Sequence, residues 1–200
     1  MDTDTIRAYD MDACNYAAEW EEDQAPPDDL RAVIRAYFKV GLTVDVGCGS
    51  GRDTAWLAGE GFDVVGVDAA PGLLAEARRR HPEVTFDVDA LPALPGLGDR
   101  IFTNVLCETV IMHLVQPDAI AAVRRLCGLL APGGTLYLSW RVGDGVDRRD
   151  DFGRLYAAFA TGAVRATLAD LNVLLDEERV SASSKRVIHR IVARRSNTKD

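Results

Sequence analysis

The chain has 200 residues and a formal net charge of −8, with 48% hydrophobic and 27% charged residues. This length suits one domain with a sizeable core, and the composition is that of an ordinary globular protein. The acidity argues against a nucleic-acid partner, because binding of duplex DNA depends largely on cations that neutralise phosphates. No apolar run is long enough to span a bilayer, so no membrane partner is expected.

The charge is unevenly distributed along the chain. Residues 1–30 hold ten Asp or Glu and one Arg, whereas residues 179–200 hold seven Lys or Arg and one Asp. Two interpretations stay open: two separate solvated faces, or a contact between one end and the other or a charged substrate.

The cysteines and histidines predict no metal site. Cys14, Cys48, Cys107 and Cys127 form no C-x-x-C pair, and the three histidines are isolated. The acidic N-terminus lacks the apolar region of a signal peptide. We therefore expect a cytoplasmic protein with reduced thiols.

The chain is expected to begin with two helices. Residues 5–22 place Tyr9, Tyr16 and Trp20 on one apolar side of a helix that ends at Pro26-Pro27. Asp28 and Asp29 can cap a second helix that runs to about residue 38.

A glycine-rich turn follows at residues 44–54. The apolar run 42–46 predicts a buried strand, and Gly47, Gly49 and Gly51 lie at alternate positions before a helix over about 51–60. A phosphate-binding P-loop is excluded because Gly51 is followed by Arg52-Asp53. The dinucleotide fingerprint G-x-G-x-x-G fails because Arg52 occupies its last glycine position.

The remaining pattern is D-x-G-x-G-x-G, from Asp45 to Gly51. It resembles motif I of the class I S-adenosylmethionine (SAM)-dependent methyltransferases. Asp68 ends the next predicted strand, where a doubly wound sheet needs an acid to accept hydrogen bonds from ribose hydroxyls; capping of the following helix is the alternative. Asp89-Ala90 follows the strand predicted over 84–88, where the resemblance implies adenine contacts and an Asp-initiated turn is the alternative.

Further family-like segments follow a strand predicted over 100–106. Val110–Leu114 resembles the V-x-x-H-L segment of small-molecule methyltransferases. Residues 130–136 resemble the L-x-P-G-G-x-L segment of class I methyltransferases, which should reverse a helix from 116 into a strand over 135–140. Thr103 departs from the acidic residue usual in relatives. His113 is a candidate proton acceptor or a structural cap, and Glu108 is the other catalytic candidate.

The resemblance also implies the set of ligand-contacting residues. Cofactor binding is expected at Tyr16, Asp45, Gly47, Cys48, Gly49, Gly51, Asp53, Asp68, Ala69, Asp89, Ala90, Leu91 and Cys107. Substrate binding is expected at Tyr9, Trp20, His113 and Arg141. The alternative for Tyr9, Tyr16 and Trp20 is that they only pack the first helix onto the domain.

The C-terminal part should close the fold. A polar segment over 141–151 predicts a lid, a helical region is expected over about 151–170, and strands are expected over 171–176 and 186–195. The resemblance implies that the last strand inserts between strands 5 and 6.

We therefore expect an α/β fold with a doubly wound, Rossmann-like, seven-stranded sheet, mostly parallel with an antiparallel last strand, and helices on both faces. A single domain should cover residues 1–200, with an N-terminal helical cap segment (1–40), a SAM-binding core (41–141) and a lid, helix and closing hairpin (142–200).

The function implied by the resemblance is transfer of a methyl group from SAM, with S-adenosylhomocysteine as product, to a small-molecule acceptor at an O, N or S atom. The cofactor carries the electrophilic activation, so a general base is not essential. A non-catalytic SAM-binding partner or sensor and an NAD-linked oxidoreductase remain as alternatives. A monomer or homodimer is expected.

Overall fold

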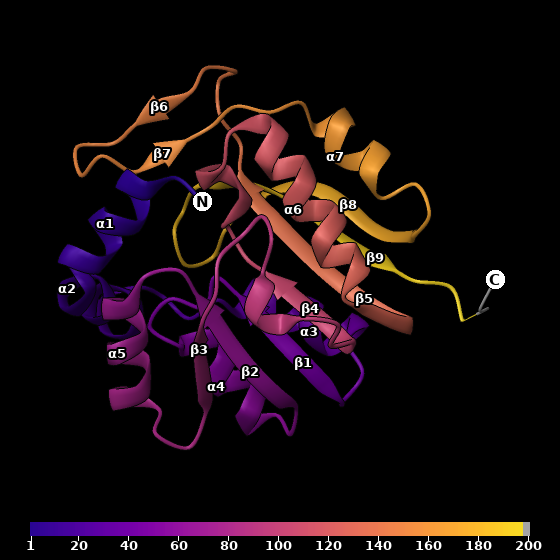
Figure 1. Cartoon of the computed structure of the whole chain (residues 1–200), viewed down its shortest axis with the longest axis horizontal. Helices are drawn as coiled ribbons and strands as arrows, with labels where there is room; N and C mark the ends of the chain where they lie inside the picture. The colour runs from indigo at the N-terminus through magenta and orange to yellow at the C-terminus, as the bar shows by residue number, and fades with distance from the viewer. Residues whose placement is uncertain (198–200) are drawn as a thin grey trace.

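The computed structural model describes residues 1–197 and is built around one central sheet (Figure 1). The strands of this sheet are β1 Leu42–Val46, β2 Asp63–Asp68, β3 Thr85–Val88, β4 Phe102–Cys107, β5 Leu130–Arg141, β8 Asn172–Val180 and β9 Val187–Arg194. Their order is β3-β2-β1-β4-β5-β9-β8. β9 pairs antiparallel with β5 and β8, and the other pairs are parallel. The predicted fold class and the inserted last strand are confirmed.

Helices cover both faces of the sheet because its strand residues alternate between two apolar clusters. Tyr137 packs with α3 (Asp28–Tyr37) and α4 (Arg52–Gly59), whereas its neighbours Leu136 and Leu138 pack with α6 (Gln116–Gly128) and α7 (Thr161–Thr167). This period of two is what a strand buried on both faces produces. Helix α5 (Pro71–Arg80) packs beside β2 and β3.

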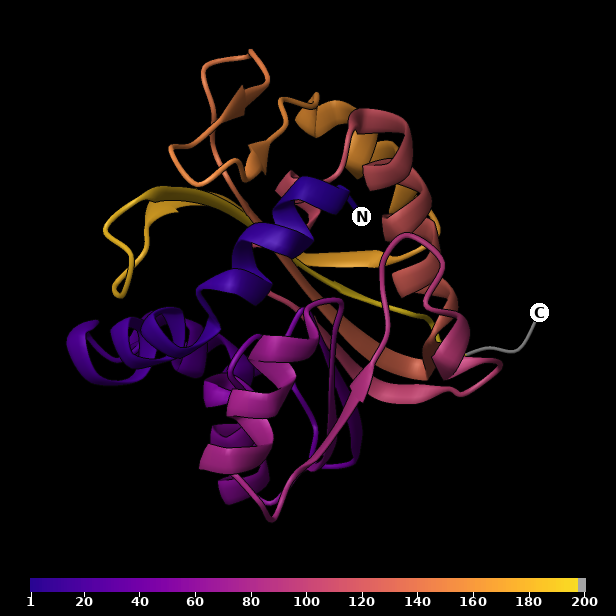
Figure 2. The same cartoon turned by 60° about the vertical axis from the view of Figure 1, so that its left-hand side comes forward.

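The predicted helix over residues 5–22 is interrupted. It is divided into α1 (Thr3–Met11), α2 (Ala13–Ala18) and a π-helical turn η1 (Glu19–Asp23). Asp12, with φ −117° and ψ 22°, leaves the helical conformation, and its side chain accepts a hydrogen bond from Asn15. Figures 1 and 2 show α1 lying between α5 and a small hairpin formed by β6 (Arg148–Arg149) and β7 (Leu155–Tyr156).

The predicted helical region over 151–170 is wrong for its first ten residues. Gly153, with φ +88°, turns the β6–β7 hairpin instead. The Leu155 N–H donates to Thr5 Oγ1 at 2.8 Å, and the Ala157 N–H donates to the Met112 carbonyl oxygen at 2.8 Å. These long-range bonds give the backbone partners that an isolated helix would have supplied, so tertiary contacts override local propensity.

The Pro-Gly-Gly turn lies inside a strand rather than before it. β5 begins at Leu130, which pairs with Phe102, and the next pair joins Thr135 to Asn104. The intervening residues bulge out of the ladder. Two short 3₁₀ turns complete the elements: η2 (Pro95–Leu97) and η3 (Ile111–His113).

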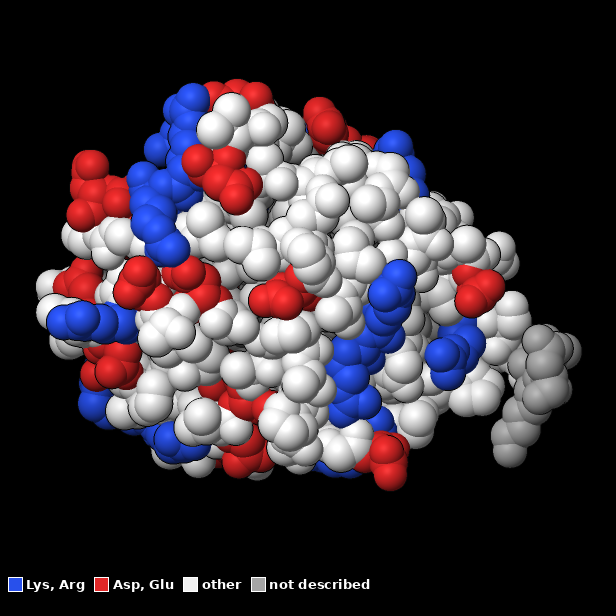
Figure 3. Space-filling model, turned by 45° about the horizontal axis from the view of Figure 1, so that its top comes forward, with Lys and Arg blue, Asp and Glu red and all other residues white. Residues whose placement is uncertain are grey.

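The unequal charges of the two ends meet at one point. Arg179 Nε lies 3.3 Å from Asp29 Oδ2, and Arg190 Nη1 donates to the Asp29 carbonyl oxygen at 3.2 Å. Elsewhere, basic and acidic side chains are interspersed on the face shown in Figure 3. Within residues 1–197, no helix has the length and apolarity needed to cross a membrane.

Asn104 gives a direct test of the β1–β4 junction. Its buried amide donates to the Lys39 carbonyl oxygen (2.8 Å) and to Thr43 Oγ1 (2.9 Å), and accepts from the Lys39 N–H (3.3 Å). Asn104→Ala leaves these groups without partners, so we expect urea denaturation to show a loss of roughly 2–4 kcal/mol in the free energy of unfolding. The exposed Asn172→Ala should change it by less than about 0.5 kcal/mol. Equal losses in the two variants would contradict this role.

Candidate active site

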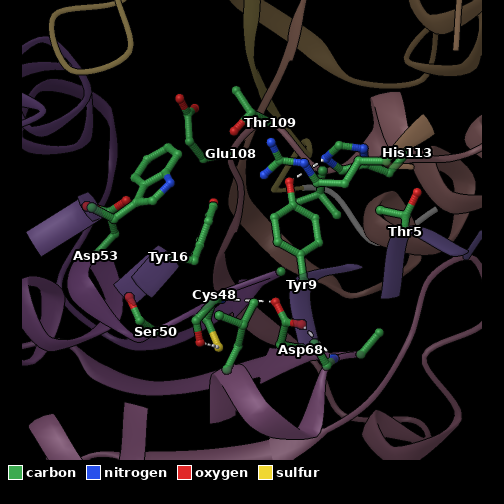
Figure 4. Close-up of a pocket in the computed structure, with 18 of the residues that line it drawn as sticks. Thr5, Tyr9, Tyr16, Cys48, Ser50, Asp53, Asp68, Glu108, Thr109 and His113 are labelled. Atoms are coloured by element: carbon green, nitrogen blue, oxygen red, sulfur yellow. Dashed lines mark hydrogen bonds between the residues drawn. The ribbon is translucent and has the colours of Figure 1, made fainter. Parts of the chain in front are cut away.

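A cavity lies at the carboxyl ends of β1, β2, β4 and β5, beneath the N-terminal helices (Figure 4). This is where ligands bind in open α/β sheets, because the strand order reverses between β1 and β4. The cavity brings together thirteen of the residues expected from the sequence to touch ligand: Tyr9, Tyr16, Trp20, Asp45, Gly47, Cys48, Gly49, Asp53, Asp68, Ala69, Glu108, His113 and Arg141.

The three glycines of the loop after β1 have different surroundings. A Cβ on Gly47 would lie 2.3 Å from Val110 Cγ2, and one on Gly51 would lie 2.7 Å from the Phe86 ring. Gly49, with φ +56°, would meet only Tyr16, at 3.9 Å, and it lines the cavity. Gly47 and Gly51 therefore allow close packing, whereas Gly49 leaves bare backbone facing the cavity.

Asp68 ties the glycine loop to the next helix. Its Oδ2 accepts the Gly49 N–H at 2.9 Å, and its Oδ1 accepts the Ala70 N–H at 2.8 Å. Burial raises the pKa of this carboxyl, while these backbone donors oppose the rise. Each oxygen accepts one bond and keeps a lone pair for a ligand hydroxyl. The N-cap residue of α5 is Ala70 rather than Asp68, and it has no side-chain cap bond, so the capping alternative for Asp68 is wrong as stated: Asp68 instead bonds the N–H of Ala70.

The other two acids of the loop are less free. Asp45 is buried and accepts a hydrogen bond from Thr54 Oγ1 at 2.6 Å, and burial raises its pKa to about 7. Asp53 forms a pair with Arg52 at 3.0 Å. Both acids line the cavity, and both are held by neighbours of the same loop and helix.

Five residues with a predicted cofactor role do not line this cavity: Gly51, Asp89, Ala90, Leu91 and Cys107. Asp89 accepts the N–H groups of Ala90 (2.9 Å) and Leu97 (3.1 Å), so both of its oxygens hold the loop after β3. Cys107 is fully buried at the end of β4. The adenine role of Asp89-Ala90 stays a prediction.

His113 has both ring nitrogens engaged. Nδ1 lies 2.5 Å from the Leu155 carbonyl oxygen, and Nε2 lies 3.0 Å from the Tyr9 hydroxyl. A carbonyl can only accept, so Nδ1 carries the proton and Nε2 accepts from Tyr9. Burial lowers the pKa of His113 to about 4, which keeps the imidazole neutral.

Glu108 is the first residue after β4, and it lines the cavity. Ser139 Oγ donates to Glu108 Oε2 at 2.5 Å and accepts the Thr109 N–H at 3.0 Å. Burial raises the pKa of Glu108 to about 7, while the Ser139 hydroxyl opposes the rise. Figure 4 shows Glu108 and Thr109 facing the cavity across from Asp68 and Cys48.

Aromatic rings from the N-terminal helices cover the cavity. The Tyr9 and Tyr16 rings meet edge to face with centroids 5.0 Å apart, and the Tyr16 and Trp20 centroids are 5.5 Å apart. The Arg52 guanidinium lies 4.8 Å from the Trp20 ring centroid. The predicted apolar side of the first helix is therefore part of the cavity wall.

Sequence reasoning missed several lining residues, among them Thr5, Ser50, Arg52, Met112 and Arg154. Arg52 had attracted notice only because it breaks the dinucleotide fingerprint. Ser50 and Met112 are next to assigned positions, so the motifs could have indicated them. Arg154 lies on the unpredicted β6–β7 hairpin, and no sequence signal placed it here.

Comparison with known proteins identifies the domain that this chain resembles. Residues 43–134 match the family model described as a methyltransferase domain. The chain is 37% identical over 134 residues to the trans-aconitate 2-methyltransferase of Methylobacterium nodulans, covering 64% of this chain and 48% of the relative. Residues 43–134 are therefore similar to a methyltransferase domain, as the resemblance of the glycine loop to motif I predicts.

A second relative is the ubiquinone biosynthesis O-methyltransferase of Xanthomonas campestris pv. campestris, 34% identical over 136 residues, or 62% of this chain and 56% of the relative. The chain thus spans about half the length of the curated relatives it matches. The magnesium protoporphyrin IX methyltransferase of Synechocystis PCC 6803, solved with bound SAM, superimposes with a TM-score of 0.76 at 20% identity, covering 98% of each chain. At that identity the likeness shows the shared fold.

The neutral state of His113 is open to direct measurement. Because its folded pKa (about 4) lies below the unfolded value near 6.5, the folded state binds fewer protons, and the resulting stability is present above pH 6.5 and lost as the pH falls towards 4. This corresponds to about 3 kcal/mol. We expect the imidazole NMR signals of His113 to stay in the neutral form down to about pH 5. Between pH 7 and 4, the free energy of unfolding of His113→Gln should fall by less than that of wild type. His81→Gln is the control, because it removes a histidine elsewhere in the chain. Titration of His113 near pH 6.5 would refute this assignment.

Proposed function

We propose that this chain binds SAM in the cavity and transfers its methyl group to a small-molecule acceptor at an O, N or S atom. The observation that carries the proposal is Asp68, which presents a carboxylate to the cavity at the end of β2 while holding Gly49 of the family's glycine loop. The names of the relatives, one for trans-aconitate and one for an O-methyl transfer, support a small acceptor.

The residues present suit the cofactor. The free lone pairs of Asp68 can accept the ribose hydroxyls, and the open backbone at Gly49 lets a ligand approach closely. The cavity lining holds more acidic side chains (Glu19, Asp45, Asp53, Asp68 and Glu108) than basic side chains (Arg52, Arg141 and Arg154), and the acidic side near the glycine loop and β4 favours a cationic sulfonium. Asp89 and Ala90 remain the proposed adenine contacts beyond the cavity's edge.

When bound, SAM supplies an electrophilic methyl group, so the chain's own task is alignment and exclusion of water. Tyr9, Tyr16 and Trp20 cover the site, and Trp20 and Tyr9 are the proposed substrate contacts. If the acceptor must lose a proton, we favour Glu108 over His113. Glu108, with a pKa of about 7, can be ionised near neutral pH, whereas His113 Nε2 already accepts from Tyr9.

Two further parts of the proposal concern setting and partners. The four cysteines are free thiols, which fits a reducing cytoplasm. The net charge of −8 argues against a nucleic-acid partner. A monomer or homodimer without membrane attachment is proposed.

Cofactor binding is tested by calorimetric titration with S-adenosylhomocysteine. We expect micromolar binding by wild type and a loss on the order of 10- to 100-fold in Asp68→Asn, because one charged hydrogen-bonding group contributes about 1.5–3 kcal/mol. Asp68→Ala should lose at least as much. Asp87→Ala, on the exposed side of β3, is the matched control, and thermal melting establishes that each variant is folded. Binding of NADH in place of S-adenosylhomocysteine would sink the proposal and favour the oxidoreductase alternative.

Turnover separates an enzyme from a non-catalytic SAM-binding protein. With labelled SAM and a panel of small acids, phenols, amines and thiols, we expect label in at least one acceptor and equimolar S-adenosylhomocysteine. Tight cofactor binding with no labelled product across the panel, trans-aconitate included, would favour the sensor alternative.

A further inference from the structure

Arg141 occupies a distinct place in the cavity. It is the last residue of β5, and its backbone N–H donates to Met112 Sδ at 3.3 Å, so it lies beside the segment that carries His113. Its side chain lines the cavity together with Met112 and His113. The position is at the carboxyl end of a central strand, on the opposite side of β4 from the glycine loop.

The guanidinium of Arg141 lacks the ion pair that the other two arginines of the cavity have. Arg52 pairs with Asp53 at 3.0 Å, and Arg154 pairs with Asp150 at 2.6 Å. Among residues 1–197, no carboxylate lies within 4.0 Å of the Arg141 guanidinium. A partly buried cation without a counter-ion is costly, so a ligand that supplies one gains binding energy.

The hydrogen-bond donors of Arg141 are also largely unused. Nη1 makes one long contact with the Tyr156 hydroxyl at 3.4 Å, and Cζ lies 5.2 Å from the Tyr156 ring centroid. Among the described residues, neither the buried Nε nor Nη2 of Arg141 has a hydrogen-bond acceptor. Nε and Nη2 form the side of the guanidinium that matches the two oxygens of a carboxylate.

We propose that the methyl acceptor is a carboxylic acid whose carboxylate binds Arg141 through Nε and Nη2. This inference rests on the proposed function and specifies its substrate class. A single unpaired arginine matches one negative charge. A phosphate dianion would need a second cation, but Asp150 already neutralises Arg154. The neighbouring Tyr9 hydroxyl donates to His113, and both groups are neutral. Arg141 is therefore the charged partner that this part of the cavity offers to a carboxylate.

The surroundings suit an acid with a flat apolar body. Tyr156 and His113 meet edge to face with centroids 5.1 Å apart, and His113 meets Tyr9 at 5.5 Å. The Tyr9 and His113 rings and Met112 line the cavity beside Arg141 and give the carboxylate site a largely apolar border, while Tyr156 packs against Arg141 and His113. A carboxylate is also already ionised at neutral pH, so its recognition needs no proton transfer to His113.

A test that does not depend on the full acceptor uses acetate, the simplest carboxylate probe. In protein saturated with S-adenosylhomocysteine, the Nε–H NMR signal of Arg141, assigned by its loss in Arg141→Lys, is followed during titration with acetate. We expect a saturable shift that chloride at the same ionic strength does not reproduce. The exposed Arg148, on the adjacent segment and paired with Asp144, is the internal control. No saturable shift at Arg141, or an equal shift at Arg148, would overturn the proposal.

Acceptor kinetics supply the second readout. Any acceptor found by the methylation panel should be a carboxylic acid, and Arg141→Gln should raise its KM on the order of 10- to 100-fold while kcat changes less. Arg141→Lys should restore part of the loss because it keeps the charge but not the two-point geometry. Arg148→Gln removes the same charge outside the cavity and should leave KM unchanged. A panel that yields only amines or neutral phenols would overturn the proposal.

Cofactor binding distinguishes failure of this inference from failure of the proposed function. Arg141→Gln should bind S-adenosylhomocysteine as wild type does. If its affinity falls as far as that of Asp68→Asn, Arg141 holds the carboxylate of the cofactor, and the acceptor assignment is wrong. If wild type itself does not bind S-adenosylhomocysteine, the proposed function fails first.

Discussion

The shape of the site depends on one carboxylate placed between two backbone segments. Asp68 accepts the N–H of Gly49 from the loop after β1 and that of Ala70 before α5. The loop can take this form only because Gly47 and Gly51 carry no Cβ where Val110 and Phe86 approach. Packing of the strands thus determines the loop, the loop and Asp68 fix each other, and both present polar groups to the cavity. Removal of the carboxylate would therefore affect geometry as well as ligand contacts, which is why the amide variant is more informative than alanine.

Electrostatically, the cavity has two different sides. Near the glycine loop and β4 the lining is rich in acids, and burial raises the pKa of Asp45 and of Glu108. Near the end of β5 lie Arg141 and Arg154, with a neutral imidazole beside them. A cationic ligand group and an anionic one are therefore favoured at different places in one cavity. That asymmetry supports a site for two ligands of opposite charge.

The sequence predicts best what local patterns determine. The buried run before Gly47, the acid at the end of β2 and the apolar alternation of the last strand all depend on nearby residues, and the strand order follows from the family that these motifs indicate. The β6–β7 hairpin was missed because the N–H groups of Leu155 and Ala157 donate to Thr5 and Met112, which are far away in the chain. Arg154 went unnoticed as a lining residue for the same reason. The sequence singled out His113, which lines the cavity, and its catalytic role stays a prediction. Its neutral state depends on burial, and its ring is held by Tyr9 and Leu155, which no spacing pattern could supply.

The order of the strands leaves β3 and β8 at the two edges of the sheet. Near its middle, β8 carries four consecutive charged residues, Asp176 to Arg179, and Asp176 and Glu177 are paired with Arg165 and Arg190. β3 is only four residues long and includes the exposed Asp87. Exposed strand edges invite pairing with further strands, and short edges or charged side chains oppose it. Both edge strands of this open sheet therefore oppose pairing with a strand of another chain.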